Sequence, residues 1–298
     1  MHKSGFVNIV GRPNVGKSTL MNALVGERMS IITNKPQTTR HRIIGILNSE
    51  DFQIVFSDTP GFIRKPAYKM QEAMNSFVEG SFEDADVMLF VTDPIESFED
   101  DDPIIEKLQK VTFPKILVIN KLDAYTPIMV EKCRAALCQK VAFSEVIEIS
   151  ATRKKNTDIL LETIKSHLQE GPEYYPKDQL TDRPERFFTA EIIREKILKN
   201  YREEIPYSCE VTIEAFEETK TKAGEPLDRI MATIYVSRET QKVILIGKGG
   251  ESIKKLGTDA RKELEKFLEA KVFLELSVKV RDNWRDDDKM LKSFGYSS

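Results

Sequence analysis

An eight-residue stretch, "GRPNVGKS", contains residue types that could hold a nucleotide phosphate. It has the spacing G-x-x-x-x-G-K-S, and it follows the apolar run "FVNIV" and precedes a helical pattern, the context of a phosphate-binding loop. Gly11 and Gly16 would let backbone N–H groups face the anion. Lys17 would reach the β and γ phosphates, and Ser18 would offer its hydroxyl to Mg²⁺. This stretch predicts a nucleotide site.

Three further short motifs each follow a predicted strand, and together they favour GTP over ATP. In "DTPG", Asp58 could hold the metal through water and the N–H of Gly61 could meet the γ phosphate. In "NKLD", Asp123 could accept hydrogen bonds from guanine, whereas adenine would leave this carboxylate unpaired. In "SAT" (150–152), a backbone N–H could meet the guanine O6. The four motifs in this order predict a GTPase.

The elements that position these motifs alternate between strands and helices. Short apolar runs typical of parallel strands are "FVNIVG", "FQIVFSD", "VMLFVTD", "KILVIN" and "EVIEIS". Amphipathic helical patterns such as "KSTLMNALVGE" and "TDILLETIKSHLQ" lie between them. Strict alternation predicts an α/β fold with a doubly wound, mostly parallel sheet over residues 1–170. Ligands bind such sheets at the carboxyl ends of the strands.

The pattern changes after this domain. Residues 171–187 contain three prolines and no periodicity, so they are predicted to be a linker. Residues 188–298 contain the helical pattern "AEIIREKILKNYREE", the strand candidates "CEVTIEAFEE" and "RIMATIYVS", a long amphipathic helix and the strand "KVFLELSVKV". This order predicts a smaller α+β domain. The last residues, with the single Trp284, are predicted to be a polar tail.

Composition places few limits on function. The net charge is −3, and residues 177–298 carry equal numbers of basic and acidic side chains, so any nucleic-acid surface must be local. Cys133, Cys138 and Cys209 lack zinc-ligand spacing and are interpreted as reduced thiols of a cytoplasmic protein. No signal peptide or membrane-spanning run is expected, although attachment to a membrane surface stays open. We expect a monomer, because no coiled-coil heptads are present.

The order of motifs resembles the Era family, bacterial ribosome assembly factors in which a P-loop GTPase domain precedes a KH RNA-binding domain of type II. The stretches that carry the resemblance are "GRPNVGKST", "PQTTRHRI", "DTPG", "NKLD", "VILIGKGGESIKKLG" and the "KVFLELSVKV"–"NW" ending. Together they span nearly the whole chain. The resemblance implies that "NKPQTTRHR" is a switch, in which Thr39 closes over the metal and Thr38 is the alternative.

Motifs and resemblance together define the expected GTP site. The expected phosphate-binding residues are Gly11, Asn14, Val15, Gly16, Lys17, Ser18, Thr19 and Gly61. The expected guanine-binding residues are Asn120, Lys121, Asp123, Ser150 and Ala151, and the expected Mg²⁺ ligands are Ser18, Thr39 and Asp58.

Two positions bear on the rate of hydrolysis. Phe62 follows Gly61 where Ras-like GTPases place a water-orienting glutamine, and phenylalanine has no polar group for this task. Slow intrinsic turnover is therefore expected. In related GTPases, an asparagine at the position of Asn14 in the phosphate loop helps to hold K⁺ against the phosphates. The positive charge of such an ion could replace that of an arginine finger.

A second glycine-rich turn, "IGKGGESIKKLG", matches neither nucleotide-binding pattern. Its context in a small α+β domain is typical of the KH backbone clamp for four nucleotides. The expected RNA-binding residues are Gly247, Lys248, Gly249, Gly250, Lys254, Lys255 and Arg261. The preceding "KVILI" favours a strand by propensity, whereas the resemblance implies a short helix, and we predict the helix.

The resemblance implies that the RNA is the 3′ end of small-subunit (16S) ribosomal RNA, bound in the GTP state during assembly of the 30S subunit. One alternative is a regulatory GTPase at the inner membrane face, whose C-terminal domain binds protein or lipid. Another is a GTPase whose C-terminal domain binds RNA without coupling to the nucleotide. For the second glycine turn, the alternative is that it binds nothing: it would only end one helix and begin the next, with its lysines in solvent.

Overall fold

The computed structural model describes residues 2–296, which form two compact units. The first unit contains residues 2–67 and 71–182, and the second contains residues 68–70 and 183–296. Among the described residues, no helix combines the length and apolar character needed to cross a bilayer.

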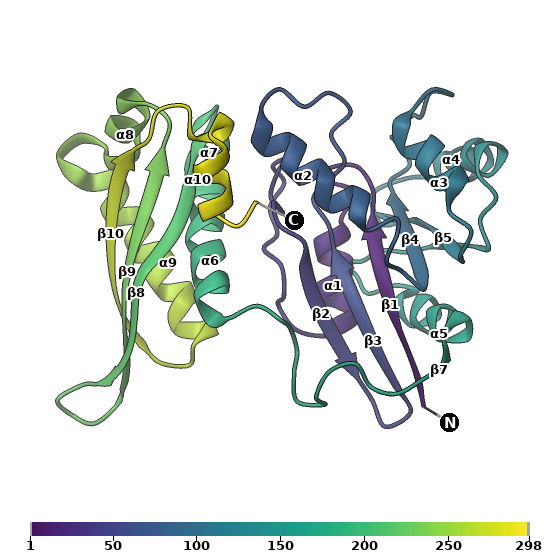
Figure 1. Cartoon of the computed structure of the whole chain (residues 1–298), viewed down its shortest axis with the longest axis horizontal. Helices are drawn as coiled ribbons and strands as arrows, with labels where there is room; N and C mark the ends of the chain where they lie inside the picture. The colour runs from purple at the N-terminus through teal and green to yellow at the C-terminus, as the bar shows by residue number, and fades with distance from the viewer. Residues whose placement is uncertain (1, 297–298) are drawn as a thin grey trace. The chain divides into compact units, whose positions relative to one another are not determined.

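The first unit is built on a seven-stranded sheet with the main order β2-β3-β1-β4-β5-β6 (Figure 1). The strands are β1 (Lys3–Val10), β2 (Ile43–Asn48), β3 (Phe52–Asp58), β4 (Val87–Thr92), β5 (Lys115–Ile119), β6 (Glu145–Glu148) and β7 (Gln169–Glu170). The five predicted strands are present and pair in parallel, which confirms the α/β prediction. β2 and β7 were not predicted, and both pair antiparallel with their neighbours.

Helices cover both faces of this sheet. They are α1 (Lys17–Val25), α2 (Lys69–Gly80), α3 (Pro103–Lys110), α4 (Pro127–Lys140) and α5 (Thr157–His167). Side chains of α2, α3 and α4 share one apolar core with β1, β4 and β5, and α1 contacts α5. Figure 1 shows α1 behind the strands and α2 in front of them. Because the strands are parallel, the loops after β1, β3 and β5 open at the same edge.

The second unit has a three-stranded sheet with the order β10-β9-β8, formed by β8 (Glu210–Lys220), β9 (Pro226–Val236) and β10 (Lys271–Val280). Its helices are α6 (Glu185–Asn200), α7 (Ile205–Ser208), α8 (Glu239–Ile246), α9 (Glu251–Phe267) and α10 (Asp288–Ser293), with 3₁₀ turns at Lys248–Gly250 and Trp284–Asp286. α6 and α9 pack on each other, α6 packs on β8, and α9 packs on β10. Leu256, Ala260 and Leu264 form the buried face of α9, as its apolar periodicity predicted.

The structure tests three sequence-based expectations about the second unit, and it corrects the first of them. α6 begins at Glu185, inside the predicted linker, because Pro184 is the residue just before the helix and its ring restricts the backbone there. The segment "KVILI" is helical, as the resemblance implied and propensity did not. The predicted polar tail packs onto the second unit, since Trp284 is fully buried and its Nε1 donates to the Ser208 carbonyl at 3.0 Å.

Candidate functional site: a nucleotide pocket and a separate glycine turn

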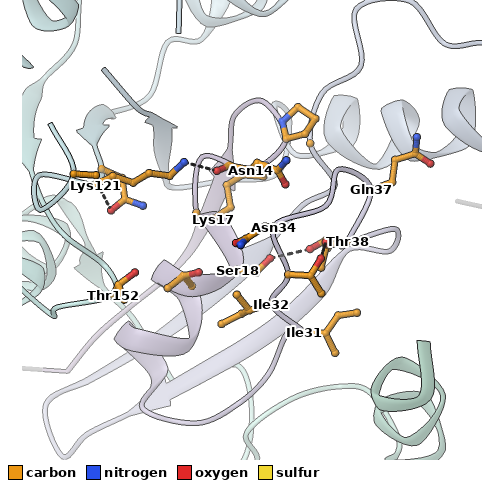
Figure 2. Close-up of a pocket in the computed structure, with 18 of the residues that line it drawn as sticks. Asn14, Lys17, Ser18, Ile31, Ile32, Asn34, Gln37, Thr38, Lys121 and Thr152 are labelled. Carbon is orange, nitrogen blue, oxygen red and sulfur yellow. Dashed lines mark hydrogen bonds between the residues drawn. The ribbon is translucent and has the colours of Figure 1, made fainter. Parts of the chain in front are cut away.

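The loop between β1 and α1 borders a cavity of about 660 Å³, shown in Figure 2. Gly16 has φ of 100°, and a Cβ there would lie 2.3 Å from Nδ2 of Asn120, so only glycine fits. The amine of Lys17 donates to the carbonyls of Gly11 and Arg12 at 3.1 and 2.8 Å. Burial lowers the pKa of Lys17 to about 8, a shift that a bound phosphate would oppose. The loop therefore presents a cation to a site that an anion could enter.

Three oxygen-bearing side chains from different elements meet beside this loop. Ser18 Oγ donates to Asp58 Oδ2 at 2.6 Å and lies 2.8 Å from Thr39 Oγ1. Asp58 is fully buried, and its Oδ1 has no hydrogen-bond partner among the described residues. Burial raises the pKa of Asp58 despite the opposing charge of Lys17. A hard cation with oxygen ligands fits this cluster, because it would satisfy the unpaired atom and favour the ionised carboxylate.

This cluster would need further ligands from the nucleotide. Within residues 2–296, no group of three or more histidine, cysteine, aspartate or glutamate side chains is arranged to hold a metal by itself. Mg²⁺ usually binds through one or two protein oxygens together with substrate phosphates and water. The set around Ser18 therefore matches a nucleotide-bound metal.

The loop after β5 supplies the opposite end of the cavity. Asn120 donates from Nδ2 to the Val15 carbonyl at 2.8 Å and accepts from the Ala151 N–H at 3.0 Å. Lys121 donates to the Asn14 carbonyl at 2.7 Å, a contact drawn in Figure 2. These bonds tie the phosphate loop to the loops after β5 and β6.

The carboxylate of Asp123 lies in the wall of the same cavity. Its Oδ1 accepts from Ser150 Oγ at 2.6 Å, and this bond lowers the pKa of Asp123. Asp123 is therefore held ionised, with further acceptor capacity for the N1–H and 2-amino groups of guanine.

Eleven of the expected GTP-site residues line the cavity, and the other five support its wall. The lining residues are Asn14, Gly16, Lys17, Ser18, Thr19, Thr38, Thr39, Gly61, Asn120, Lys121 and Asp123. Gly11, Val15, Asp58, Ser150 and Ala151 hydrogen-bond to members of that set.

The switch segment places its two threonines differently. Thr39 is buried and faces Ser18 and Asp58, whereas Thr38 Oγ1 donates to the Lys35 carbonyl at 2.7 Å. Phe62 is buried in the core of the first unit, and its N–H donates to the Gly11 carbonyl at 3.1 Å. The side chain at this position therefore cannot orient water.

Motif reasoning missed part of the cavity wall. The lining residues outside the expected set are Pro13, Ile31, Ile32, Thr33, Asn34, Gln37, Ala124 and Thr152; of these, Pro13 and Thr152 lie inside the motifs "GRPNVGKS" and "SAT". Most of them lie in the irregular stretch before Thr38, where no spacing rule applies. Asn34 and Gln37 belong to the "NKPQTTRHR" segment, so that the resemblance indicated this region without naming them as contacts.

The second glycine turn joins α8 to α9. Gly250 precedes the first residue of α9 with φ of 79°, and a Cβ on Gly249 or Gly250 would meet open space. The charged side chains expected to contact RNA are all exposed: Lys248, Lys254, Lys255 and Arg261. Val243 and Ile244, which are 64% and 51% exposed on the preceding helix, were not predicted as site residues. Two exposed apolar side chains beside a basic glycine turn are suited to unpaired bases and their backbone.

Comparison with known proteins defines the family. Residues 6–121 match a family described as 50S ribosome-binding GTPase, and residues 204–285 match the KH domain. The chain is 47% identical over 298 residues to the GTPase Era of Clostridium perfringens, with 99% of each chain covered. It is 48% identical over 297 residues to the GTPase Era of Caldicellulosiruptor saccharolyticus, with 99% and 98% covered. The chain belongs to the Era family of GTPases.

Solved Era structures have the same fold. One is an Aquifex aeolicus Era with a tyrosine-to-alanine substitution bound to GDP·AlF4⁻, with a TM-score of 0.90, 38% identity and coverage of 99% and 100%. Another is Era in complex with MgGDPNP and nucleotides 1506–1542 of 16S ribosomal RNA, with a TM-score of 0.91, 38% identity and full coverage of both chains. As an Era-family member, this chain is a GTPase with a C-terminal KH domain.

Proposed function

We propose that this chain is a GTP-driven switch that binds the 3′ end of 16S ribosomal RNA through its KH domain and assists assembly of the 30S subunit. The observation that carries this proposal is full-length similarity to an Era solved with MgGDPNP and a 16S RNA fragment. The exposed basic side chains around Gly249 and Gly250 agree with an RNA contact there. We place the protein in the cytoplasm, as a monomer.

The nucleotide site divides its tasks among the loops. Lys17 and the backbone of residues 11–19 hold the phosphates, and the N–H of Gly61 meets the γ phosphate. Asp123 binds the guanine base, while Asn120 and Lys121 hold the phosphate loop in place through hydrogen bonds to its carbonyls. Ser18, Thr39 and Asp58 would hold Mg²⁺ between the phosphates and the switch segment. The ion would supply charge neutralisation on the phosphate oxygens.

Hydrolysis rests on positioning rather than on a protein base. Phe62 is apolar and buried, so the intrinsic rate is slow. Thr39 couples the switch segment to the γ phosphate, because both would bind the same Mg²⁺. Loss of the γ phosphate after hydrolysis would therefore release Thr39 and the switch segment. In our proposal, RNA affinity falls when the switch segment is released.

K⁺ should raise the hydrolysis rate at least about tenfold over Na⁺ at equal ionic strength, because a cation held against the phosphates replaces an arginine finger. Asn14 lines the cavity and has a left-handed backbone, with φ of 65°. Asn14→Gly is the variant of choice, because it removes the side-chain amide and glycine adopts this φ without strain. It should lose the preference for K⁺ while retaining GDP binding. Phosphate release in the two salts measures the effect, and equal wild-type rates would exclude it.

RNA affinity should depend on the bound nucleotide. A short RNA copying the 3′ end of 16S rRNA is titrated at one salt concentration against protein loaded with a non-hydrolysable GTP analogue and against protein loaded with GDP. We expect at least about tenfold tighter binding in the GTP-like state, within the usual range of coupling between two sites. The coupling must also be reciprocal: RNA should raise the affinity for the GTP analogue relative to GDP by the same factor.

Equal affinity in both states would leave a GTPase and an RNA-binding domain on one chain without a switch. Absence of RNA binding in both states would favour a C-terminal domain that binds protein or lipid. A scrambled RNA of the same length is the matched control, because it carries the same phosphate charge.

A further inference from the structure

A buried carboxylate in the second unit has no partner. Asp228, near the start of β9, is 7% exposed, and its side chain makes no hydrogen bond or ion pair within residues 2–296. Partial removal of an ionised carboxylate from water is unfavourable unless a counter-charge or donors replace the lost hydration. The oxygens of Asp228 are not among the fully buried atoms that lack a partner, so a ligand from solution can reach them.

A second carboxylate lies directly across the sheet. Glu218 of β8 pairs with Asp228 in the antiparallel register, and like charges at paired positions are unfavourable. Burial, and then the charge of Glu218, raises the pKa of Asp228. A cation between the two carboxylates would reverse both effects.

The two carboxylates line a cavity of about 750 Å³. Glu185, at the first turn of α6, adds a third acidic side chain to its wall. Leu268 and Ala270 contribute apolar surface just beyond the C-terminal end of α9, where the helix dipole favours positive charge. Lys220 also lines the cavity, but it forms no ion pair with any of these carboxylates within the described chain.

We propose that this cavity binds an organic cation, a primary ammonium or guanidinium group carried on an aliphatic stem. Asp228 and Glu218 would bind the charged group, and Leu268 and Ala270 would cover the stem. A bare metal ion fits less well. No group of metal-ligating side chains is arranged for one within residues 2–296, and the cavity is much larger than an ion.

This site is distinct from the proposed RNA contact. The glycine turn precedes Glu251 at the N-terminal end of α9, whereas Leu268 follows its C-terminal end. A 17-residue helix separates the two ends by about 25 Å. The cation and the RNA backbone would therefore bind at opposite ends of one helix without overlap.

Calorimetric titration of the full-length chain tests the proposal, at a pH of about 7.5 and constant ionic strength, where free carboxylates are ionised. Spermidine represents a free polyamine, and N-acetylarginine amide represents a protein side chain. We expect saturable binding of at least one probe with one site per chain. Asp228→Asn and Glu218→Gln should each weaken it at least about tenfold, because each removes a charge-assisted contact. Glu217→Gln is the matched control and should bind as the wild type does, because Glu217 is exposed and points to the other face of β8.

The relative affinity of the probes identifies the source of the cation. Tighter binding of spermidine supports a free polyamine, and tighter binding of the arginine amide supports a side chain of a protein partner. Failure of both probes to saturate would overturn the proposal. Equal weakening by Glu217→Gln would do so too, since it would indicate general charge attraction.

Thermal unfolding of the ligand-free variants gives a second readout. Asp228→Asn should raise the calorimetric midpoint near neutral pH, because it removes a buried charge without a counter-charge. The gain should shrink as the pH falls through the raised folded pKa of Asp228, where the wild-type carboxyl becomes neutral. A lowered midpoint would show that the carboxylate has a structural role, and the cation site would be wrong.

Discussion

Lys17→Ala should reduce GTP and GDP affinity by at least about 100-fold and abolish measurable hydrolysis, because a charge-assisted contact inside a water-poor site is lost. The side chain is only 5% exposed, and its amine is held by two carbonyls of the phosphate loop. No other lysine occupies the loop. Fluorescent-nucleotide titration measures the affinity, and phosphate release measures the rate.

Lys110→Ala is the control for this experiment. Lys110 is an exposed lysine in the last turn of α3 and lies outside the cavity. It should leave both measurements unchanged. A far-UV circular dichroism spectrum equal to that of the wild type would show that the Lys17 variant is folded. Nucleotide affinity close to that of the wild type would contradict the role assigned to Lys17.

Lys248→Asp combined with Gly249→Asp should weaken RNA binding by about 100-fold or more while leaving GTP affinity intact. The change replaces one positive charge by two negative ones at the turn proposed to clamp the backbone. A Cβ on Gly249 meets open space, and its φ of 60° is one that aspartate tolerates. The RNA effect should therefore come from charge and contact rather than from misfolding.

The pair Lys222→Asp and Ala223→Asp supplies a control of equal charge change. Both residues are exposed in the turn between β8 and β9. If long-range charge alone governed RNA binding, the two double variants would weaken it equally. If only the Lys248→Asp, Gly249→Asp variant loses RNA affinity, the RNA contact lies at the glycine turn. If the RNA affinity of that variant is unchanged, the assignment of this turn as the KH backbone clamp is wrong.

The phosphate loop was predictable because its chemistry is local. Gly16, Lys17 and Ser18 are contiguous, and a strand and a helix on either side fix their direction. Asp58 and Asp123 were predictable for a related reason, since parallel strands deliver their ends to one edge. The wall formed by Ile31, Asn34 and Gln37 obeys no periodicity, so that only tertiary folding places it.

In the second unit, propensity and tertiary structure disagree at α8. Its β-branched residues favour a strand, yet Gln241 and Leu245 are the buried positions, with the four-residue spacing of a helix face. The hydroxyl of Tyr201 donates to the Leu245 carbonyl at 2.8 Å, a contact that local sequence does not reveal. Likewise, only the folded chain shows that Asp228 lacks a partner.

The position of Trp284 gives the protein an intrinsic optical reporter. It is the single tryptophan and is fully buried, and the ring of Phe294 packs edge-on against it with 5.4 Å between the ring centroids. Its fluorescence therefore originates in the second unit alone, and the GTPase domain contributes no tryptophan signal. Emission excited at the red edge of the indole band thus separates unfolding of the KH unit from that of its neighbour without any added label.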